Sequence, residues 1–135
     1  EPRSLLLVGF SASFAAKLAD TFGSEIGKRW GRRPVLITTL RSVPPGTEGA
    51  ISLAGTLASA AGSVLMTLVM WQLQLLPSIS VSLVVMLIGL LATLAESLIG
   101  ALAQDRFRWL SNELVNALQT LLAAVMAMLW LAGRI

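Results

Sequence analysis

Charged residues occur along the chain in short clusters separated by long uncharged stretches. No charged side chain is present in residues 49–95 or in residues 114–133. A helix of about 20 apolar residues spans the hydrocarbon core of a bilayer. The first stretch is therefore long enough for two crossings with a turn near Pro77, and the second for one. A further apolar stretch begins at Leu5 and becomes polar toward Lys28.

These stretches predict an all-α fold, a polytopic transmembrane bundle of about four helices in a single integral membrane domain over residues 1–135. The composition agrees, because only 13% of the residues are charged, whereas soluble domains carry about a quarter. The chain begins with Glu1 rather than methionine, and we expect further N-terminal helices or a homo-oligomer to complete the bundle. The predicted helices cover about 4–28, 49–73, 80–104 and 112–131, with a loop at 29–48.

The basic residues predict how this bundle is oriented. The connection from Lys28 to Arg41 is rich in basic side chains and holds no acid, and the connection after the third helix holds Arg106 and Arg108. The turn near Pro77 is uncharged. By the positive-inside rule, both basic loops face the cytoplasm, or the stroma if the protein lies in a plastid.

One face of the first helix is polar. Ionisable groups inside a membrane helix cost about 2.5–3.5 kcal/mol each at mid-bilayer on insertion scales, so such a face points into the bundle or toward a water-filled pocket. Two interpretations are open: Lys17 and Asp20 form an ion pair that helps the helix to pack, or the face lines a site for a polyanion and its metal. The residues that share this face at intervals of three and four are Ser13, Lys17, Asp20, Thr21, Ser24 and Lys28.

Four acids, Asp20, Glu25, Glu48 and Glu96, are expected at the same membrane face. Carboxylates near one plane repel each other unless a cation lies among them. Mg²⁺ is typically held by one or two carboxylates plus substrate phosphates, so this pattern favours a Mg²⁺-phosphate site beneath the basic loop. The chain has no cysteine and no histidine, which excludes disulfides, Cys-based zinc sites and a histidine base.

The segment VPPGTEG at 43–49 is the most distinctive loop sequence. Its prolines stiffen the backbone, and its glycines allow positive φ and close backbone approach. Successive N–H groups in such a turn can bind an anion, as can the N-terminus of the helix that follows. The alternative is an ordinary helix-initiating turn. Asn112 and Asn116 have a similar ambiguity, between binding a substrate and capping or bridging helices.

Taken in order, four motifs resemble one known family. They are KLADTFGSEIGK at 17–28, VPPGTEG at 43–49, ESLIGA at 96–101 and NELVN at 112–116. They resemble the membrane family that contains plant and cyanobacterial phytyl-phosphate kinase and transmembrane protein 19. The chain is also distantly similar to polyprenol kinases and CDP-lipid synthases, which use CTP. The resemblance implies transfer of the γ-phosphoryl group of CTP to phytyl or another prenyl monophosphate, which in plants and cyanobacteria feeds tocopherol synthesis.

The resemblance also implies roles for individual residues. Asp20, Glu25 and Glu96 would hold Mg²⁺, and Lys17 and Lys28 would bind phosphates, so Asp20, Lys17 and Lys28 form the expected catalytic set. A phosphate acceptor is already ionised near neutral pH, so positioning and charge stabilisation suffice without a strong base. The expected nucleotide-binding residues are Ser24, Pro45, Gly46, Thr47, Glu48, Gly49, Ser52, Thr56, Asn112 and Asn116.

Three other functions stay open at this point. A cytidylyltransferase would make a CDP-lipid and release pyrophosphate. A membrane transporter would carry ionisable residues near the midplane of several helices, whereas here they cluster toward one side. A purely structural subunit leaves the converging acids unexplained. Because the basic residues lie beside a membrane and no DNA-binding motif is present, we expect no nucleic-acid partner.

Overall fold

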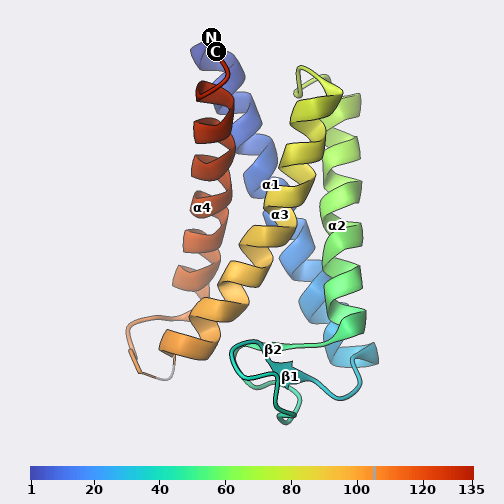
Figure 1. Cartoon of the computed structure of the whole chain (residues 1–135), viewed down its shortest axis with the longest axis vertical. Helices are drawn as coiled ribbons and strands as arrows, with labels where there is room; N and C mark the ends of the chain where they lie inside the picture. Colours follow the sequence, from blue (N-terminus) through green and yellow to red (C-terminus); the bar gives the residue numbers. More distant parts are fainter. Residues whose placement is uncertain (105) are drawn as a thin grey trace.

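The computed structural model describes residues 1–104 and 106–135, and four long helices dominate it (Figure 1). Each helix is long and apolar enough to cross a membrane. The predicted all-α membrane bundle is therefore confirmed. The helices are α1 (Pro2–Trp30), α2 (Leu53–Gln72), α3 (Ile79–Ile99) and α4 (Asn112–Ala132).

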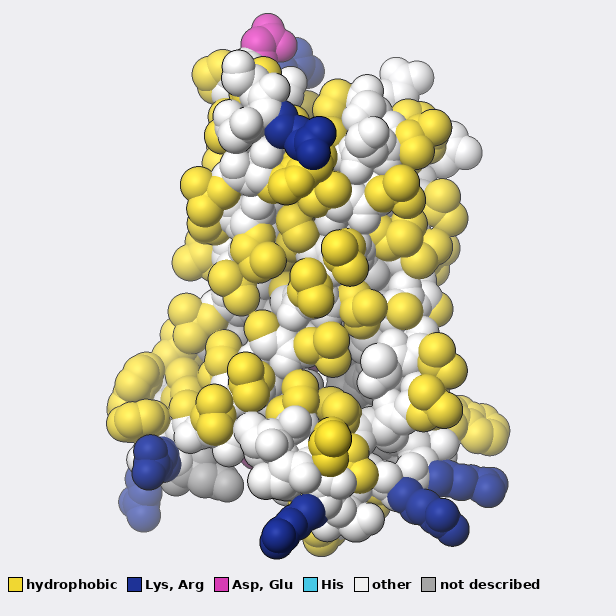
Figure 2. Space-filling view, viewed as in Figure 1, with side chains coloured by type: hydrophobic (Ala, Val, Ile, Leu, Met, Phe, Trp, Pro, Cys, Tyr) yellow, Lys and Arg dark blue, Asp and Glu magenta, His cyan; other side chains and the backbone are white. Residues whose placement is uncertain are grey.

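The helices run between two ends of the molecule. Both chain termini lie at one end, close to the turn that joins α2 to α3 (Figure 1). The α1–α2 loop and the α3–α4 connection lie at the other end, which we call the loop end. Lys and Arg side chains gather at the two ends, and a belt of hydrophobic side chains lies between them (Figure 2). This distribution matches a bilayer, whose apolar core accepts the belt and whose headgroup regions accept the charges.

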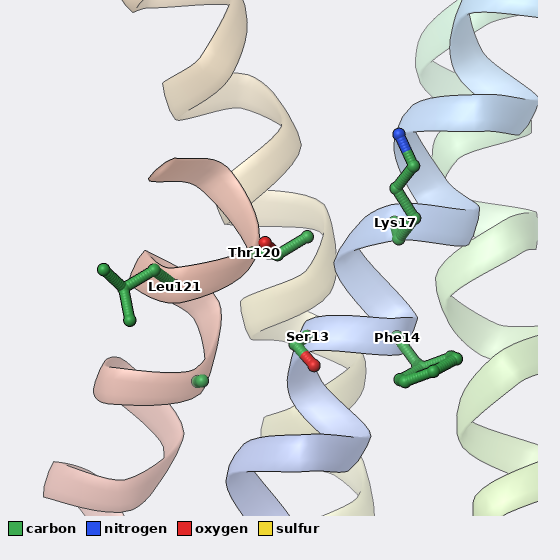
Figure 3. Close-up of a pocket in the computed structure, with 6 residues that line it drawn as sticks. Ser13, Phe14, Lys17, Thr120 and Leu121 are labelled. Atoms are coloured by element: carbon green, nitrogen blue, oxygen red, sulfur yellow. The ribbon is translucent and has the colours of Figure 1, made fainter. Parts of the chain in front are cut away.

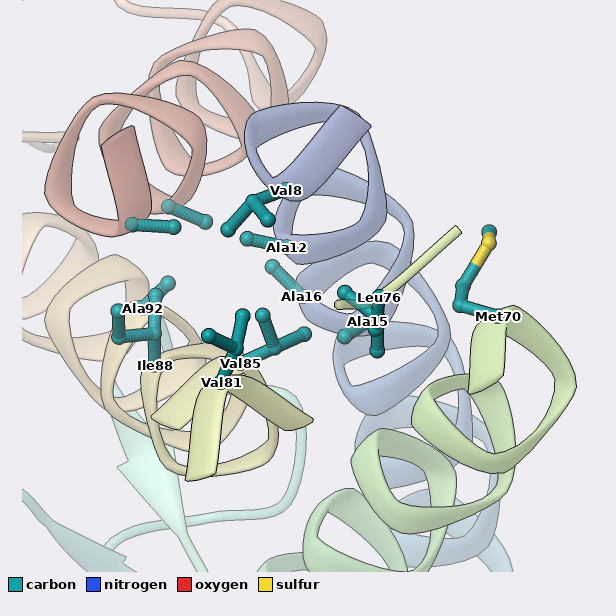
Figure 4. Close-up of a cluster of buried hydrophobic side chains, with 12 residues drawn as sticks. Val8, Ala12, Ala15, Ala16, Met70, Leu76, Val81, Val85, Ile88 and Ala92 are labelled. Carbon is teal, nitrogen blue, oxygen red and sulfur yellow. The ribbon is translucent and has the colours of Figure 1, made fainter. Parts of the chain in front are cut away.

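Helix α1 is the central element, because its contacts with the other three helices are the most extensive in the bundle. Its buried face is made of small side chains, among them Ala12, Ala15 and Ala16, which meet Val85 and Ala92 of α3 (Figure 4). Small side chains allow the close helix approach on which packing inside a membrane depends. Tight packing along α1 therefore fixes where its polar residues lie relative to the neighbouring helices.

The α1–α2 loop carries structure that the helical pattern did not predict. The strands β1 (Val35–Leu36) and β2 (Ala50–Ile51) pair in antiparallel fashion, with Val35 opposite Ile51. Helix α2 consequently begins at Leu53 rather than near residue 49. Gly49 has a left-handed φ of +79°, and the Ser52 side chain caps the helix by accepting a hydrogen bond from the Gly55 N–H at 3.1 Å.

The third helical span, Ile79–Gln104, covers the predicted residues, but its last turn is not regular α-helix. Regular α-helix stops at Ile99, and the chain continues as a π-helical turn, η1 (Gly100–Gln104). Wider turns of this kind occur mostly as short insertions and frequently at functional sites. Because η1 lies at the loop end, it is placed next to the predicted site.

Candidate active site

Asp20 of α1 and Glu96 of α3 bring two carboxyl groups together at the loop end. The Asp20 side chain is only 15% exposed, and its Oδ2 lies 3.8 Å from the Lys17 ammonium nitrogen. The half-buried Glu96 carboxyl lies against that of Asp20. The two helices can approach each other closely because Gly89 of α3 has no side chain. A side-chain carbon at Gly89 would lie 3.1 Å from the Ala15 backbone of α1. The Lys17–Asp20 ion pair thus exists, but helix packing alone does not account for the second acid.

This carboxyl pair fits a magnesium ion that is shared with a phosphate ligand. Two ionised carboxylates in contact repel each other, and a cation between them removes that penalty. No group of three acidic side chains within the described residues is close enough to hold a metal by itself. Mg²⁺ is usually bound by one or two carboxylates, with substrate phosphates and water completing its shell. Two carboxylates match the share of ligands that a protein contributes to such an ion.

The VPPGTEG segment forms a compact turn above the pair. The backbone N–H and the hydroxyl of Thr47 both donate to the Pro44 carbonyl, at 3.2 and 2.7 Å. Gly46 at the tip has a φ of +88° and no other group near the position of a side chain. Pro45 and Gly46 are exposed. The tip is therefore accessible to a ligand, although its conformation is set by internal hydrogen bonds.

The other side of the turn is pressed against η1. A side-chain carbon at Gly49 would lie 2.7 Å from the backbone nitrogen of Ala101, and one at Gly100 would lie 3.2 Å from the Gly49 nitrogen. The same close approach brings Glu48 Oε2 to 3.6 Å from that position at Gly100, so Glu48 is near enough to act electrostatically on Glu96. The loop thereby adds a third acid at the edge of the pair.

The α3–α4 connection is fastened by amide side chains. Gln104, at the end of η1, donates from Nε2 to Oδ1 of Asn112, the first residue of α4, at 2.5 Å. The cap of α4 is supplied by Ser111, whose hydroxyl accepts from the Leu114 N–H. Asn112 therefore bridges two elements rather than capping one. Asn116 lies one turn further into α4 and is half-buried.

Glu25 does not join the carboxyl pair, and the predicted set of three metal ligands is not assembled. Its side chain is 71% exposed and lies 3.7 Å from Lys28, which is 70% exposed. The reason is helical geometry, because five residues of α-helix place Glu25 about 140° around the axis from Asp20. Lys28 remains at the loop end, where it belongs to the exposed basic surface rather than to the pair.

The other predicted nucleotide-binding residues lie near the loop end but are partly engaged. The Ser24 hydroxyl donates to the Asp20 carbonyl of its own helix at 2.7 Å, and Ser52 is used as the α2 cap. Thr56 is half-buried in the first turns of α2. Exposed basic side chains also lie at the loop end (Figure 2). They include Lys28, Arg29, Arg32, Arg33 and Arg41.

Sequence reasoning missed a polar network one turn deeper in the bundle. Gln119 of α4, only 1% exposed, donates from Nε2 to the Ala16 carbonyl at 3.0 Å and to the Thr93 hydroxyl at 3.1 Å. Ala16 precedes Asp20 by one turn, and Thr93 precedes Glu96 by about one turn. The network therefore ties three helices together directly beneath the pair. A glutamine within an uncharged transmembrane stretch was the available signal.

Comparison with known proteins places this geometry in a family. Residues 2–124 match the family described as "Integral membrane protein DUF92". The chain belongs to this family. It is therefore an integral membrane protein, and the family resemblance drawn from the four motifs is confirmed.

Three curated relatives in this family match nearly the whole chain. An uncharacterised membrane protein of Synechocystis is 44% identical over 94% of the chain. The chloroplastic protein VTE6 of Arabidopsis thaliana is 43% identical over 93%. An uncharacterised membrane protein of Methanocaldococcus jannaschii is 39% identical over 91%. The chain spans 49%, 38% and 50% of their respective lengths, and no solved structure matches it.

Proposed function

We propose that this protein is a prenyl-phosphate kinase that transfers the γ-phosphoryl group of CTP to phytyl or another prenyl monophosphate. The observation that supports this most directly is the contact of Asp20 with Glu96, beside Lys17 and beneath a basic loop. The motif resemblance supports the choice of CTP, and the 43% identity to chloroplastic VTE6 supports a function related to prenyl-phosphate kinases. The site lies at the boundary of the apolar belt, where a lipid phosphate and a soluble nucleotide can meet.

Magnesium is part of this proposal. Asp20 and Glu96 would hold the ion, with Glu48 close enough to bind one of its waters or the ribose. Bound there, Mg²⁺ would bridge phosphate oxygens and neutralise the charge that develops on them. Glu25 is left out of the proposed ligand set, because its exposed side chain pairs with Lys28 instead.

The protein's own residues would act mainly by position and charge. Lys17, half-exposed next to Asp20, would bind the acceptor phosphate, and the basic side chains around Lys28 would bind the triphosphate. The acceptor is already an anion near neutral pH, so it needs no general base, and catalysis can rest on alignment and electrostatics. The absence of histidine from the chain is compatible with this chemistry.

The distribution of ionisable residues argues against a transporter. Residues 49–95 and 114–133 carry no charged side chain, so α2 and most of α4 offer no ionisable group at mid-membrane. A translocation pathway would place such groups near the centre of the bilayer. The acids of the site instead lie together at the loop end, as a one-sided catalytic site requires.

The decisive experiment is an assay of the purified protein in nanodiscs with phytyl monophosphate, Mg²⁺ and each of the four nucleoside triphosphates. We expect phytyl diphosphate and CDP with CTP. Asp20→Asn should lower kcat by about a hundredfold or more, as removal of a metal-site or charge-stabilising group does. Glu113→Gln, an exposed acid at the start of α4, is the matched control and should retain activity.

Two further readouts sharpen this assay. Glu25→Gln tests the metal ligands expected from the sequence, which include Glu25, against the structure, in which Glu25 is an exposed partner of Lys28. We expect this variant to change kcat by less than threefold. If the products are pyrophosphate and a CDP-lipid, the protein is a cytidylyltransferase and not a kinase. No turnover with any nucleotide, from protein shown to be folded, would reject both.

A further inference from the structure

A groove opens between α1 and α4 on the membrane side of the carboxyl pair (Figure 3). Its volume is about 410 Å³. The two helices are in contact near the end that holds the chain termini, which we call the terminal end. There, a side-chain carbon at Gly9 of α1 would lie 2.8 Å from the Met128 side chain of α4. The helices diverge toward the loop end (Figure 1). The groove is therefore closed at its deep end and widens toward the site. Its lining residues are Ser13, Phe14, Lys17, Thr120, Leu121 and Ala124.

The walls of this groove suit a hydrocarbon. Phe14 and Leu121 are exposed apolar side chains, 44% and 60% accessible. The two hydroxyls are already satisfied within their own helices, because Ser13 donates to the Phe10 carbonyl at 2.8 Å and Thr120 to the Ala117 carbonyl at 3.0 Å. A polar ligand would thus find little to bind along the walls.

Lys17 places a positive charge among the residues that line the groove. Its side chain is half-exposed and, in Figure 3, extends along α1 away from Ser13. The same ammonium group lies 3.8 Å from Asp20, so the groove leads directly to the carboxyl pair. The Lys17 side chain stays half-exposed despite this ion pair, so its ammonium group is accessible to a second anion. A ligand with an apolar chain and an anionic head satisfies both the walls and Lys17.

We propose that the α1–α4 groove binds the hydrocarbon chain of an amphipathic lipid monophosphate, with Lys17 at its phosphate. This assignment rests on the proposed kinase function and adds to it the position of the acceptor and its route of entry from the side of the bilayer. The phosphate would then lie between Lys17 and the ion held by Asp20 and Glu96. The competing occupant of the groove is a further apolar helix. Such a helix would leave Asp20 as the only anion beside the Lys17 ammonium group.

Photolabelling tests the location independently of activity. The probe is a prenyl monophosphate with a diazirine in its chain, added to the purified protein in nanodiscs and mapped by mass spectrometry. We expect label on Phe14, Thr120 or Leu121, displaced by unlabelled phytyl monophosphate. Label confined to α2 or the outer face of α3, or label that the competitor does not displace, would overturn the proposal.

A pair of variants tests the same groove by kinetics. Thr120→Phe fills it, whereas Val125→Phe introduces the same side chain at an exposed position of α4 that does not line the groove. We expect Thr120→Phe to raise KM for phytyl monophosphate by about tenfold or more, since excluding two methylene groups from an apolar site changes affinity by roughly that factor. KM for geranyl monophosphate, whose chain is half as long, should change less, and Val125→Phe should change neither.

The outcomes separate this proposal from the kinase function. If KM changes equally for both acceptors in both variants, or in neither variant, the proposed role of the groove is wrong. The proposed kinase function would be unaffected by that result. Displaceable label in the groove of a protein without phosphoryl transfer would reject the kinase and support a lipid-phosphate site there. A melting temperature measured for each variant confirms that it is folded.

Discussion

At the scale of single residues, Gln119 is the most informative side chain that the sequence did not single out. Its amide nitrogen makes two interhelical hydrogen bonds, but its carbonyl oxygen, Oε1, is buried without a partner among the described residues. A buried unsatisfied acceptor costs about 1–3 kcal/mol. Hydrogen bonds between membrane helices stabilise by only about 0.6 kcal/mol on average. The two effects at this residue are therefore of similar size and opposite sign.

We predict that Gln119→Leu leaves the free energy of unfolding unchanged or raises it by about 1 kcal/mol. The substitution removes two modest hydrogen bonds and one unsatisfied oxygen, and leucine keeps the site filled. Thr93→Val is the matched comparison. It removes an acceptor of Gln119 and a donor to Gly89 without relieving Oε1, so it should destabilise by about 1 kcal/mol.

Both variants can be measured by unfolding in a titration with SDS in mixed micelles. A loss of more than about 2 kcal/mol for Gln119→Leu would contradict the prediction and would indicate a buried water on Oε1, since such waters bridge otherwise unsatisfied groups. In the same variants, a measurement of kcat tests whether the network also fixes the position of Asp20 relative to Glu96. We expect kcat to fall in Gln119→Leu even though stability does not.

At the scale of elements, the contact between the VPPGTEG turn and η1 positions the loop over the site. Gly49 and Gly46 both have left-handed φ values, +79° and +88°. They differ in surroundings, because only Gly49 lies against Ala101, whereas Gly46 has open space where a side chain would be. The two glycines therefore form a natural matched pair.

We predict that Gly46→Ala destabilises by about 1–2 kcal/mol, the cost of left-handed backbone in a residue with a side chain, and keeps most of its activity. Gly49→Ala carries the same strain and in addition forces the turn away from η1, which moves Glu48 relative to Glu96. A displacement of about 1 Å near a reacting centre can lower the rate by roughly a hundredfold. Steady-state kinetics with CTP and phytyl monophosphate measure this. Equal kcat values for the two variants would show that the turn does not position the site.

These elements also show how far the sequence alone could lead. Uncharged stretches predicted three of the four helices, and the apolar run that begins at Leu5 predicted the first. The side on which each helix ends predicted that Asp20 and Glu96 would approach each other. Glu25 was misplaced because sharing one end of a helix does not fix the direction of a side chain around its axis. The π-turn η1 and the burial of Gln119 depend on which helix faces pack together, and periodicity within one helix contains no such information.

At the scale of the whole molecule, charge asymmetry between the two ends predicts the orientation in the membrane. The loop end carries the basic cluster from Lys28 to Arg41, together with Arg106 and Arg108. The terminal end carries fewer basic groups, Arg3 and Arg134, of which Arg134 lies over the Trp130 ring at 4.6 Å. Basic side chains in short loops are retained on the cytoplasmic side. The carboxyl pair is therefore predicted to face the compartment that supplies nucleotides.

The absence of cysteine from residues 1–135 makes this orientation directly measurable, because an introduced cysteine is then the sole thiol within this part of the protein. We predict that Thr38→Cys in the α1–α2 loop and Arg108→Cys before α4 resist a membrane-impermeant maleimide in intact cells and react once the cells are permeabilised. Ser80→Cys, in the first turn of α3 at the opposite end, should react from outside. Labelling of Thr38→Cys but not Ser80→Cys in intact cells would reverse the topology. A nucleotide-dependent kinase would then be left without access to cytoplasmic CTP, so this result would count against the proposed function as well as against the orientation.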